Sequence, residues 1–126
     1  GPMAGVLAGL RAAANGGFDA ALTVAVDTPF FPMDLRARLE SGGADGRVAI
    51  AASAGRAHPV FGRWPAALAP AAQAFFDRGG RSPDRFSTDQ GRALVIWETA
   101  PFDPFANLNT PEDRDLLEAI AASLAP

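Results

Sequence analysis

An aspartate at the end of an apolar run is the residue of this chain best placed to do chemistry. Asp27 follows the stretch 20–26, in which leucine, threonine and valine mix with alanine, and it is followed by Thr28 and Pro29. Such runs are typical of strands that are covered on both faces, as in parallel sheets. Ligands of open α/β sheets bind beyond the carboxyl ends of strands, so a carboxylate there can hold a metal ion or a ligand hydroxyl. The alternative is that Asp27 only begins a turn, with Pro29 fixing the backbone.

Two asparagines near the C-terminal end are the second candidate. Asn107 and Asn109 come just before Thr110, a good N-cap, and Pro111, which suits a first helical position. Side-chain amides beside the free N–H groups of a helix N-terminus can bind a phosphate or the polar edge of a ligand. Asparagine is also common in turns, so a purely structural role is the alternative.

Histidine and arginine supply further candidates. His58 is the only histidine, and no serine or cysteine nucleophile pattern surrounds it, which favours a packed side chain over a catalyst. Arg81 belongs to the segment 78–85, which carries three arginines among glycine, serine and proline. Such a loop can hold a phosphate, although exposed arginines usually bind no ligand.

The N-terminal segment offers another kind of site. A helix is predicted over 4–14, and the small or rigid residues Gly1, Pro2 and Gly5 would let a ligand approach its N-terminus, whose free N–H groups suit phosphate. An alternative is that Gly1 and Pro2 remain from cleavage of a tag and that Met3 is the encoded start.

The elements that must position these residues alternate between strands and helices. After the strand 20–26, the sequence predicts a helix with Pro32 in its first turn that ends before Gly42. A strand–helix–strand unit follows, because 47–53 is again apolar. The remaining predicted elements are a strand over 60–64 with Gly62 allowing close backbone approach, a helix over 65–78, a strand over 92–98 and a helix over 110–124.

Composition limits the classes of function. A chain of 126 residues with 48% hydrophobic residues predicts a soluble globular protein of one domain, or a large piece of one. The absence of cysteine removes disulfides and thiolate chemistry, and the net charge of −3 argues against nucleic-acid binding. No apolar run approaches the roughly 20 residues of a membrane span, and no signal pattern opens the chain, so no membrane partner and a cytoplasmic location are predicted.

Several stretches together resemble the molybdenum cofactor guanylyltransferases, the MobA-type members of the nucleotidyltransferase group. They are GPMAGVLAGL at 1–10, VAVDTPFFPMDLRARL at 24–39, HPVFGRW at 58–64, GGR at 79–81 and NLNTPEDRDLLEA at 107–119. Their order and spacing agree over essentially the whole chain. The resemblance implies a single α/β domain over 1–126, the C-terminal portion of a three-layer α/β/α Rossmann-like nucleotidyltransferase fold.

The same resemblance implies an activity. Members join GMP from GTP to the terminal phosphate of molybdopterin and release pyrophosphate, with Mg²⁺ offsetting the charge between the two phosphates. The residues that it assigns are Asp27 to magnesium and catalysis, Gly1 and Gly5 to the nucleotide, Asn107, Asn109 and Arg81 to molybdopterin, and His58 to shaping the site.

The chain departs from the family at its N-terminus. Members begin with a strand and a glycine-rich loop, L-A-G-G-x-S-x-R-M-G followed by a lysine, which hold the nucleotide; this sequence has neither that loop nor any lysine. Phosphate transfer depends on positioning and charge neutralisation, so the fold is predicted to be N-terminally incomplete and this polypeptide inactive alone. A missing first strand also exposes a sheet edge and an apolar face, which predicts a homo-oligomer.

Two other functions stay open. A related molybdopterin cytidylyltransferase would act on the same pterin, since the choice between guanine and cytosine is made largely in the missing segment. A non-catalytic module for pterin binding or assembly would keep the pterin half and the oligomer surface. The encoded sequence upstream of Gly1 distinguishes the enzyme from the module.

Overall fold

The computed structural model describes residues 1–25 and 31–105. Asp27, Asn107, Asn109 and the helix predicted over 110–124 lie outside these residues. The described elements are α1 (Pro2–Asn15), β1 (Ala20–Thr23), α2 (Leu35–Gly42), β2 (Ala49–Ser53), β3 (Arg56–Pro65), the 3-10 turn η1 (Ala66–Leu68), α3 (Ala69–Asp77), α4 (Pro83–Asp89) and β4 (Ala93–Ile96).

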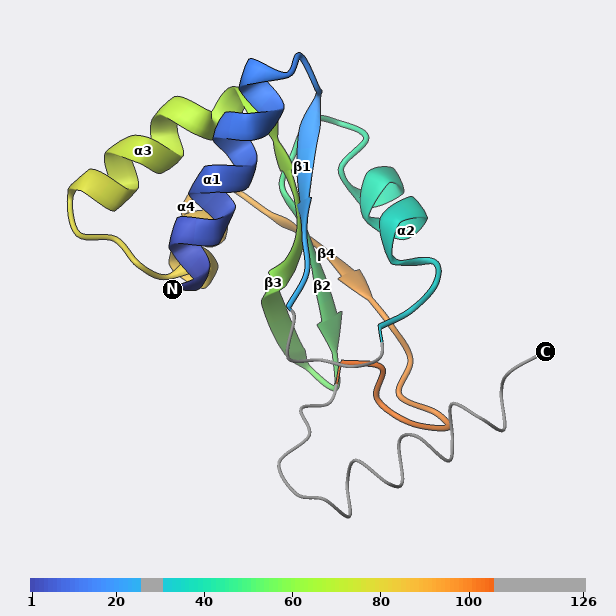
Figure 1. The fold of residues 1–126 in the computed structure, drawn as a ribbon. Coiled ribbons are helices and arrows are strands. Elements are labelled where there is room, and N and C mark those ends of the chain that lie inside the picture. Colours follow the sequence, from blue (N-terminus) through green and yellow to red (C-terminus); the bar gives the residue numbers. More distant parts are fainter. Residues whose placement is uncertain (26–30, 106–126) are drawn as a thin grey trace.

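The strands form one mixed sheet in the order β1-β3-β2-β4 (Figure 1). β3 runs antiparallel to both β1 and β2, whereas β4 pairs with β2 in parallel. β1, β2 and β4 therefore share one direction, and their carboxyl ends lie at the same end of the sheet. The predicted strand–helix–strand unit is present as β1-α2-β2, but β3 lies between its two strands.

Helices cover both faces of the sheet, which confirms the α/β class. α1, α3 and α4 lie on one face and α2 lies on the other (Figure 1). Side chains of β2 alternate between the two cores: Ile50 joins Leu10 and Trp64 under α1, whereas Ala51 joins Leu39 under α2. Every residue of β2 is buried, as its continuous apolar sequence predicts.

The prediction for β1 is wrong in one respect. The strand was predicted to be covered on both faces, and only one face is covered. Ala21 faces α1, where a β-carbon at Gly9 would lie 3.6 Å from that of Ala21, but Leu22 and Val24 are 43% and 40% exposed. The reason is tertiary: β1 lies at the edge of the sheet, and α2 packs mainly against β2 and β4.

β3 is longer than predicted and contains an irregularity that matters for the site. Ile50 pairs with Gly62, but the next residue, Ala51, pairs with His58, so residues 59–61 bulge out of the ladder. Pro59 has no N–H to donate and therefore fits such a bulge. A β-carbon at Gly62 would lie 2.7 Å from Cδ1 of Ile50, which confirms the predicted close approach.

Two helices differ from the sequence prediction. α2 begins only at Leu35 and includes Gly42, whose β-carbon would come within 2.5 Å of Cγ2 of Val95. α4 begins inside the segment 78–85, which was predicted to be a loop, and continues to Asp89. The hydroxyl of Ser82 accepts a hydrogen bond from the backbone N–H of Arg85 at 3.0 Å, as an N-cap does.

Phe86 explains why the 83–89 segment is helical. It is 1% exposed, and its ring centre lies 6.0 Å from that of Trp64 and 5.3 Å from that of Phe75. A short helix with a weak intrinsic signal is thus held by burial of one aromatic ring. No helix among the described residues combines the length and apolarity needed to cross a membrane.

Candidate functional site

The N-terminus of α1 lies at the end of the sheet to which β1 points. A short turn joins the two elements, so α1 runs back along β1. The 14 residues of α1 rise about 21 Å, and the six residues from Ala20 to Ala25 extend about 20 Å. Gly1 and Gly5 therefore lie at the end of the sheet where the chain continues towards Asp27 (Figure 1). A β-carbon at either glycine would have no neighbour within 4 Å, so a ligand can approach.

An aromatic cluster, formed by Phe31, Phe61, Trp97 and Phe105, packs at this same end of the sheet. Ring centres are 6.5 Å apart for Phe31 and Phe61, 4.9 Å for Phe61 and Phe105, and 5.3 Å for Trp97 and Phe105. Ala25 packs against the buried core that contains Phe61, Trp97 and Phe105. Ala25 and Phe31 flank residues 26–30, and Phe105 precedes residue 106. All three lie at this end of the sheet, beside Phe61 or the core that contains it. Asp27 and the asparagine pair belong to segments that start from neighbouring points.

Three polar side chains meet beside the aromatic cluster, and we call them the polar relay: His58, Ser53 and Asp103. The hydroxyl of Ser53 donates to Oδ1 of Asp103 at 2.7 Å, and it lies 2.7 Å from Nε2 of His58. A serine hydroxyl can donate only one hydrogen bond, and Ser53 donates it to Asp103. The bond to His58 therefore has Nε2–H of His58 as its donor and the hydroxyl of Ser53 as its acceptor. Oδ1 of Asp103 also accepts the backbone N–H of Phe105 at 2.9 Å.

The polar relay does not have the geometry of a nucleophilic triad. In a triad the histidine lies between serine and aspartate and takes the serine proton. Here Ser53 is the central residue. It is 1% exposed and donates its hydrogen bond to Asp103. His58 also stacks on the ring of Phe105, with ring centres 5.0 Å apart, so it is held both by its face and by Nε2.

The environment of His58 favours its neutral form. Burial lowers the pKa of His58 below its ordinary value, and the nearby charge of Arg56 lowers it further, whereas the charge of Asp103 raises it. Burial is the largest of these causes, so the direction is downward.

Sequence reasoning found His58 but missed its two partners. Ser53 is a polar residue at the end of an apolar strand, the same signal that drew attention to Asp27. Asp103 lies in an irregular segment after β4, and only the fold brings it beside Ser53.

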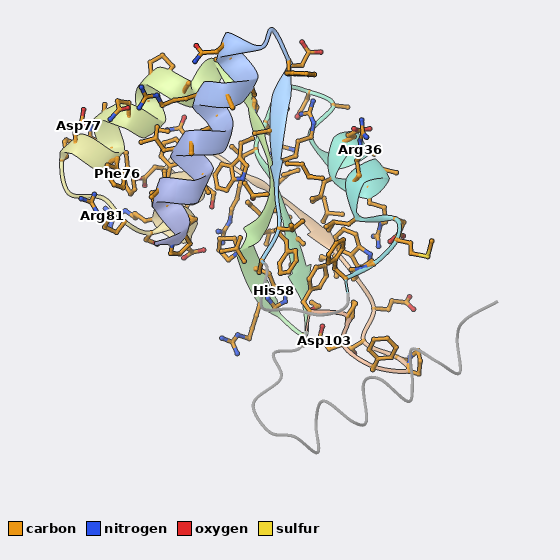
Figure 2. The ribbon with its side chains drawn as sticks, in the orientation of Figure 1. Arg36, His58, Phe76, Asp77, Arg81 and Asp103 are labelled. Carbon is orange, nitrogen blue, oxygen red and sulfur yellow. The ribbon has the colours of Figure 1, made fainter. Side chains whose placement is uncertain are left out.

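Arg81 lies elsewhere, in the loop between α3 and α4. Its Nη1 donates to the carbonyls of Phe76 and Gly80 at 2.8 and 2.9 Å, and its guanidinium lies 3.7 Å from the ring centre of Phe76. Figure 2 shows Arg81 well apart from His58 and Asp103. The structure therefore does not bring Arg81 into the polar relay.

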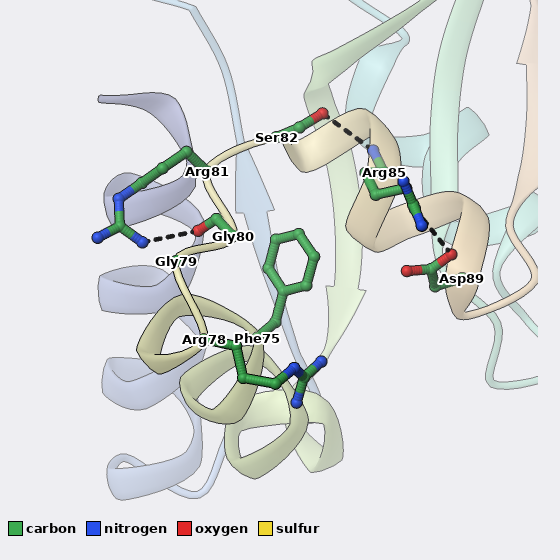
Figure 3. A pocket seen from close by; sticks show the side chains of 8 residues that line it. All are labelled: Phe75, Arg78, Gly79, Gly80, Arg81, Ser82, Arg85 and Asp89. Carbon is green, nitrogen blue, oxygen red and sulfur yellow. Dashed lines mark hydrogen bonds and ion pairs between the residues drawn. The ribbon is translucent and has the colours of Figure 1, made fainter.

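The loop of Arg81 borders a shallow hollow of about 620 Å³ (Figure 3). Arg85, on its wall, pairs with Asp89 at 3.4 Å. Because Arg81 and Arg85 already have partners and are exposed, the hollow has basic walls but no buried anchor for an anion. Its lining residues are Phe75, Arg78, Gly79, Gly80, Arg81, Ser82, Arg85 and Asp89.

A metal centre of several ligands is not found in the described parts of the chain. Residues 1–25 and 31–105 contain no group of three histidine, aspartate or glutamate side chains that could hold an ion. Mg²⁺ is commonly bound by one or two carboxylates together with substrate phosphates. A single aspartate such as Asp27 would suit that mode.

The fold and this site define a class of protein. A sheet between two helical layers, with polar groups at the carboxyl ends of its strands and a helix N-terminus beside them, is typical of α/β proteins that bind nucleotides or other phosphorylated ligands. Residues 1–94 match the family described as "MobA-like NTP transferase domain", and the chain belongs to this family.

Curated relatives agree with the family. The chain is 46% identical to a molybdenum cofactor guanylyltransferase from Rhodopseudomonas palustris (strain BisB5), over 96% of this chain and 60% of the relative. It is also 46% identical to a protein of the same name from Acidiphilium cryptum (strain JF-5), over 94% and 58%. The chain spans about 60% of the length of the curated relatives it matches.

The solved structures support the fold. Molybdopterin-guanine dinucleotide biosynthesis protein A from Archaeoglobus fulgidus aligns with a TM-score of 0.68 and 21% identity, over 97% of this chain and 63% of that one. A putative protein from Aquifex aeolicus VF5 aligns with a TM-score of 0.72 and 17% identity, over 86% and 56%.

Proposed function

We propose that this chain is part of a molybdenum cofactor guanylyltransferase, which transfers GMP from GTP to molybdopterin and releases pyrophosphate. Family membership and the names of the relatives support this activity. The observation that carries it is the aromatic cluster, because Ala25, Phe31 and Phe105 flank the segments of Asp27, Asn107 and Asn109 and all pack in it or against the buried core around it.

Each candidate residue then takes a role. The N-terminus of α1, with Gly1 and Gly5, lies beside the nucleotide phosphates, where exposed N–H groups suit an anion. Asp27 holds Mg²⁺, which when bound offsets the charge of the reacting phosphates. Asn107 and Asn109 hold the pterin side.

Two candidates need separate comment. We place Arg81 on an anionic group of molybdopterin, which requires it to leave the carbonyls of Phe76 and Gly80. His58 shapes the site and transfers no proton, since the attacking phosphate is already anionic.

The test compares Asp27→Asn with the unchanged protein, made from the complete reading frame. With GTP, molybdopterin and magnesium, pyrophosphate release should fall about 100-fold or more, because several kcal/mol of charge stabilisation depend on the metal. Asp77→Asn, an exposed aspartate on α3, is the control and should leave the rate unchanged. Equal rates in Asp27→Asn and the unchanged protein would contradict the assignment.

The same assay separates the other functions. Turnover of CTP in place of GTP would identify a cytidylyltransferase. Pterin binding without pyrophosphate release from either nucleotide would identify a non-catalytic module. For the 126-residue chain alone, which has no lysine, GTP with magnesium should not raise the melting temperature.

We also infer that the isolated chain self-associates through β1. The N–H of Ala66 donates to the carbonyl of Asp19 at 2.8 Å, and hydrogen-bonded pairs alternate along an antiparallel ladder. The backbone groups of Ala20 and Leu22 therefore point away from β3, to the open edge. An open edge with exposed apolar side chains is a template for another strand, so a second copy is the proposed occupant.

The opposite edge of the sheet is protected. Nη2 of Arg38 donates to the carbonyl of Ile96 on β4 at 2.6 Å, and the guanidinium lies 4.2 Å from the ring centre of Trp97. A charged side chain on an edge carbonyl obstructs strand pairing. The asymmetry between the edges favours β1 as the contact.

A further inference from the structure

The polar relay has no part in the chemistry proposed above, yet it joins the β2–β3 hairpin to a segment 50 residues further along the chain. Ser53 ends β2, His58 lies near the start of β3, and Asp103 belongs to the irregular segment after β4. Two hydrogen bonds of 2.7 Å connect them through one hydroxyl. Because Ser53 is 1% exposed, water cannot replace either partner without cost.

Asp103 fixes the backbone that follows it. Its Oδ1 accepts the N–H of Phe105, two residues later, at 2.9 Å, which is the pattern of an Asx turn. Pro104 lies between them and restricts its own φ. The carboxylate therefore links the shape of the chain at 103–105 to the position of Ser53.

Three rings hold Phe105 in place. His58 stacks on it with an angle of 24° between the planes, whereas Phe61 and Trp97 meet it at 64° and 76°. Phe105 is 4% exposed. His58 therefore makes two contacts: its ring face stacks on Phe105, and its Nε2 hydrogen-bonds to Ser53.

We propose that the polar relay of His58, Ser53 and Asp103 is a positioning device, which fixes the chain at Phe105 and so sets where Asn107 and Asn109 meet the pterin substrate. Asn107 follows Phe105 by only two residues, at most about 7 Å of chain. This inference rests on the proposed function, because that function assigns both asparagines to the pterin.

The kinetic test uses the protein from the complete reading frame, with Ser53→Ala and Asp103→Ala. Each should raise KM for molybdopterin about tenfold, the effect of one misplaced hydrogen bond, and leave KM for GTP unchanged. Ser53→Thr keeps the hydroxyl and should restore most of the affinity, and His58→Gln, which retains an N–H donor, should be milder than His58→Leu.

Ser87→Ala is the matched control. Ser87 is 0% exposed and donates to the carbonyl of Asp84 at 3.0 Å, far along the chain from the relay. A merely structural role for Ser53 predicts that both alanine variants lower the melting temperature with unchanged KM for molybdopterin. That result would overturn the proposal.

A second readout does not depend on the activity. In the 126-residue chain, Ser53→Ala should speed amide hydrogen exchange at Phe105, whose N–H donates to Asp103, while leaving α1 and β1 unchanged. If the complete protein shows no nucleotidyl transfer but this exchange pattern appears, the proposed function fails and the positioning role stands. Unchanged exchange at Phe105 would reject the positioning role itself.

Discussion

Nε1 of Trp64 donates a hydrogen bond to Oγ1 of Thr23 at 3.0 Å. Trp64 is 0% exposed and lies at the centre of the core under α1, whereas Thr23 ends the edge strand β1. An indole has a single N–H, so this hydroxyl satisfies it completely. The bond therefore connects the last residue of β1, four positions before Asp27, to a fully buried ring of the core.

Thr23→Val removes the hydroxyl and keeps the shape. The buried N–H of Trp64 then has no acceptor from Thr23, and the free energy of unfolding should fall by about 1–3 kcal/mol. Urea denaturation followed by tryptophan fluorescence measures this change. Thr23→Ser keeps the acceptor and should lose less, and an equal loss in both variants would show that the hydrogen bond contributes nothing.

Gly62→Ala should destabilise the sheet. The new methyl group would lie 2.7 Å from Cδ1 of Ile50 and 3.0 Å from Nε1 of Trp64, both in fully buried residues. Overpacking of this kind costs about 1–3 kcal/mol, which thermal denaturation would record.

Gly5→Ala is the control for that substitution. Gly5 lies within α1 and has no atom within 4 Å of a β-carbon. Alanine there should stabilise the helix by about 0.5–1 kcal/mol. A Gly62→Ala protein as stable as Gly5→Ala would contradict the close approach at Gly62.

Stability should fall as the pH drops through the titration range of histidine. The pKa of His58 is lowered in the folded protein, chiefly by burial, and the unfolded chain takes up its proton near pH 6.5. The contribution of His58 to the free energy of unfolding is therefore fully present above about pH 6.5. It is lost as the pH falls from there to the folded pKa, because the unfolded state binds more protons over that range.

Urea denaturation between about pH 5.5 and 7 measures this dependence, since carboxylates titrate mostly below that range. His58 is the only histidine, so His58→Gln should flatten the curve. An unchanged slope in His58→Gln would assign the effect to another group.

Leu22→Lys should reduce self-association of the 126-residue chain. The added charge lies on the open edge of β1, and lysine on an edge strand opposes pairing. Light scattering measures the mass. Leu94→Lys, on the β4 edge where the leucine is 48% exposed, is the matched control and should leave the mass unchanged. A monomeric unchanged chain at high concentration would refute the contact.

Some elements could be predicted from the residues within them. The helix α1 and the buried strand β2 follow from periodicity and from a continuous apolar run, and Gly62 was identified as a close approach. The helix α4 was missed, because its burial depends on Phe86 meeting Trp64 and Phe75, which are distant in sequence. The prediction that β1 is covered on both faces was wrong, since no local pattern reveals which strand lies at the edge of a sheet.

The sequence by itself determined the family, the order of the strands and of every described helix except α4, and the residue types able to bind a phosphorylated ligand, because these depend on short-range patterns. Only the tertiary structure decided that Ser53, His58 and Asp103 share one hydrogen-bonded relay and that Phe61 packs against both Phe31 and Phe105. Contacts between segments separated by tens of residues depend on the register of β3 and on its bulge. Neither the register nor the bulge can be recognised from the sequence around the residues that it brings together.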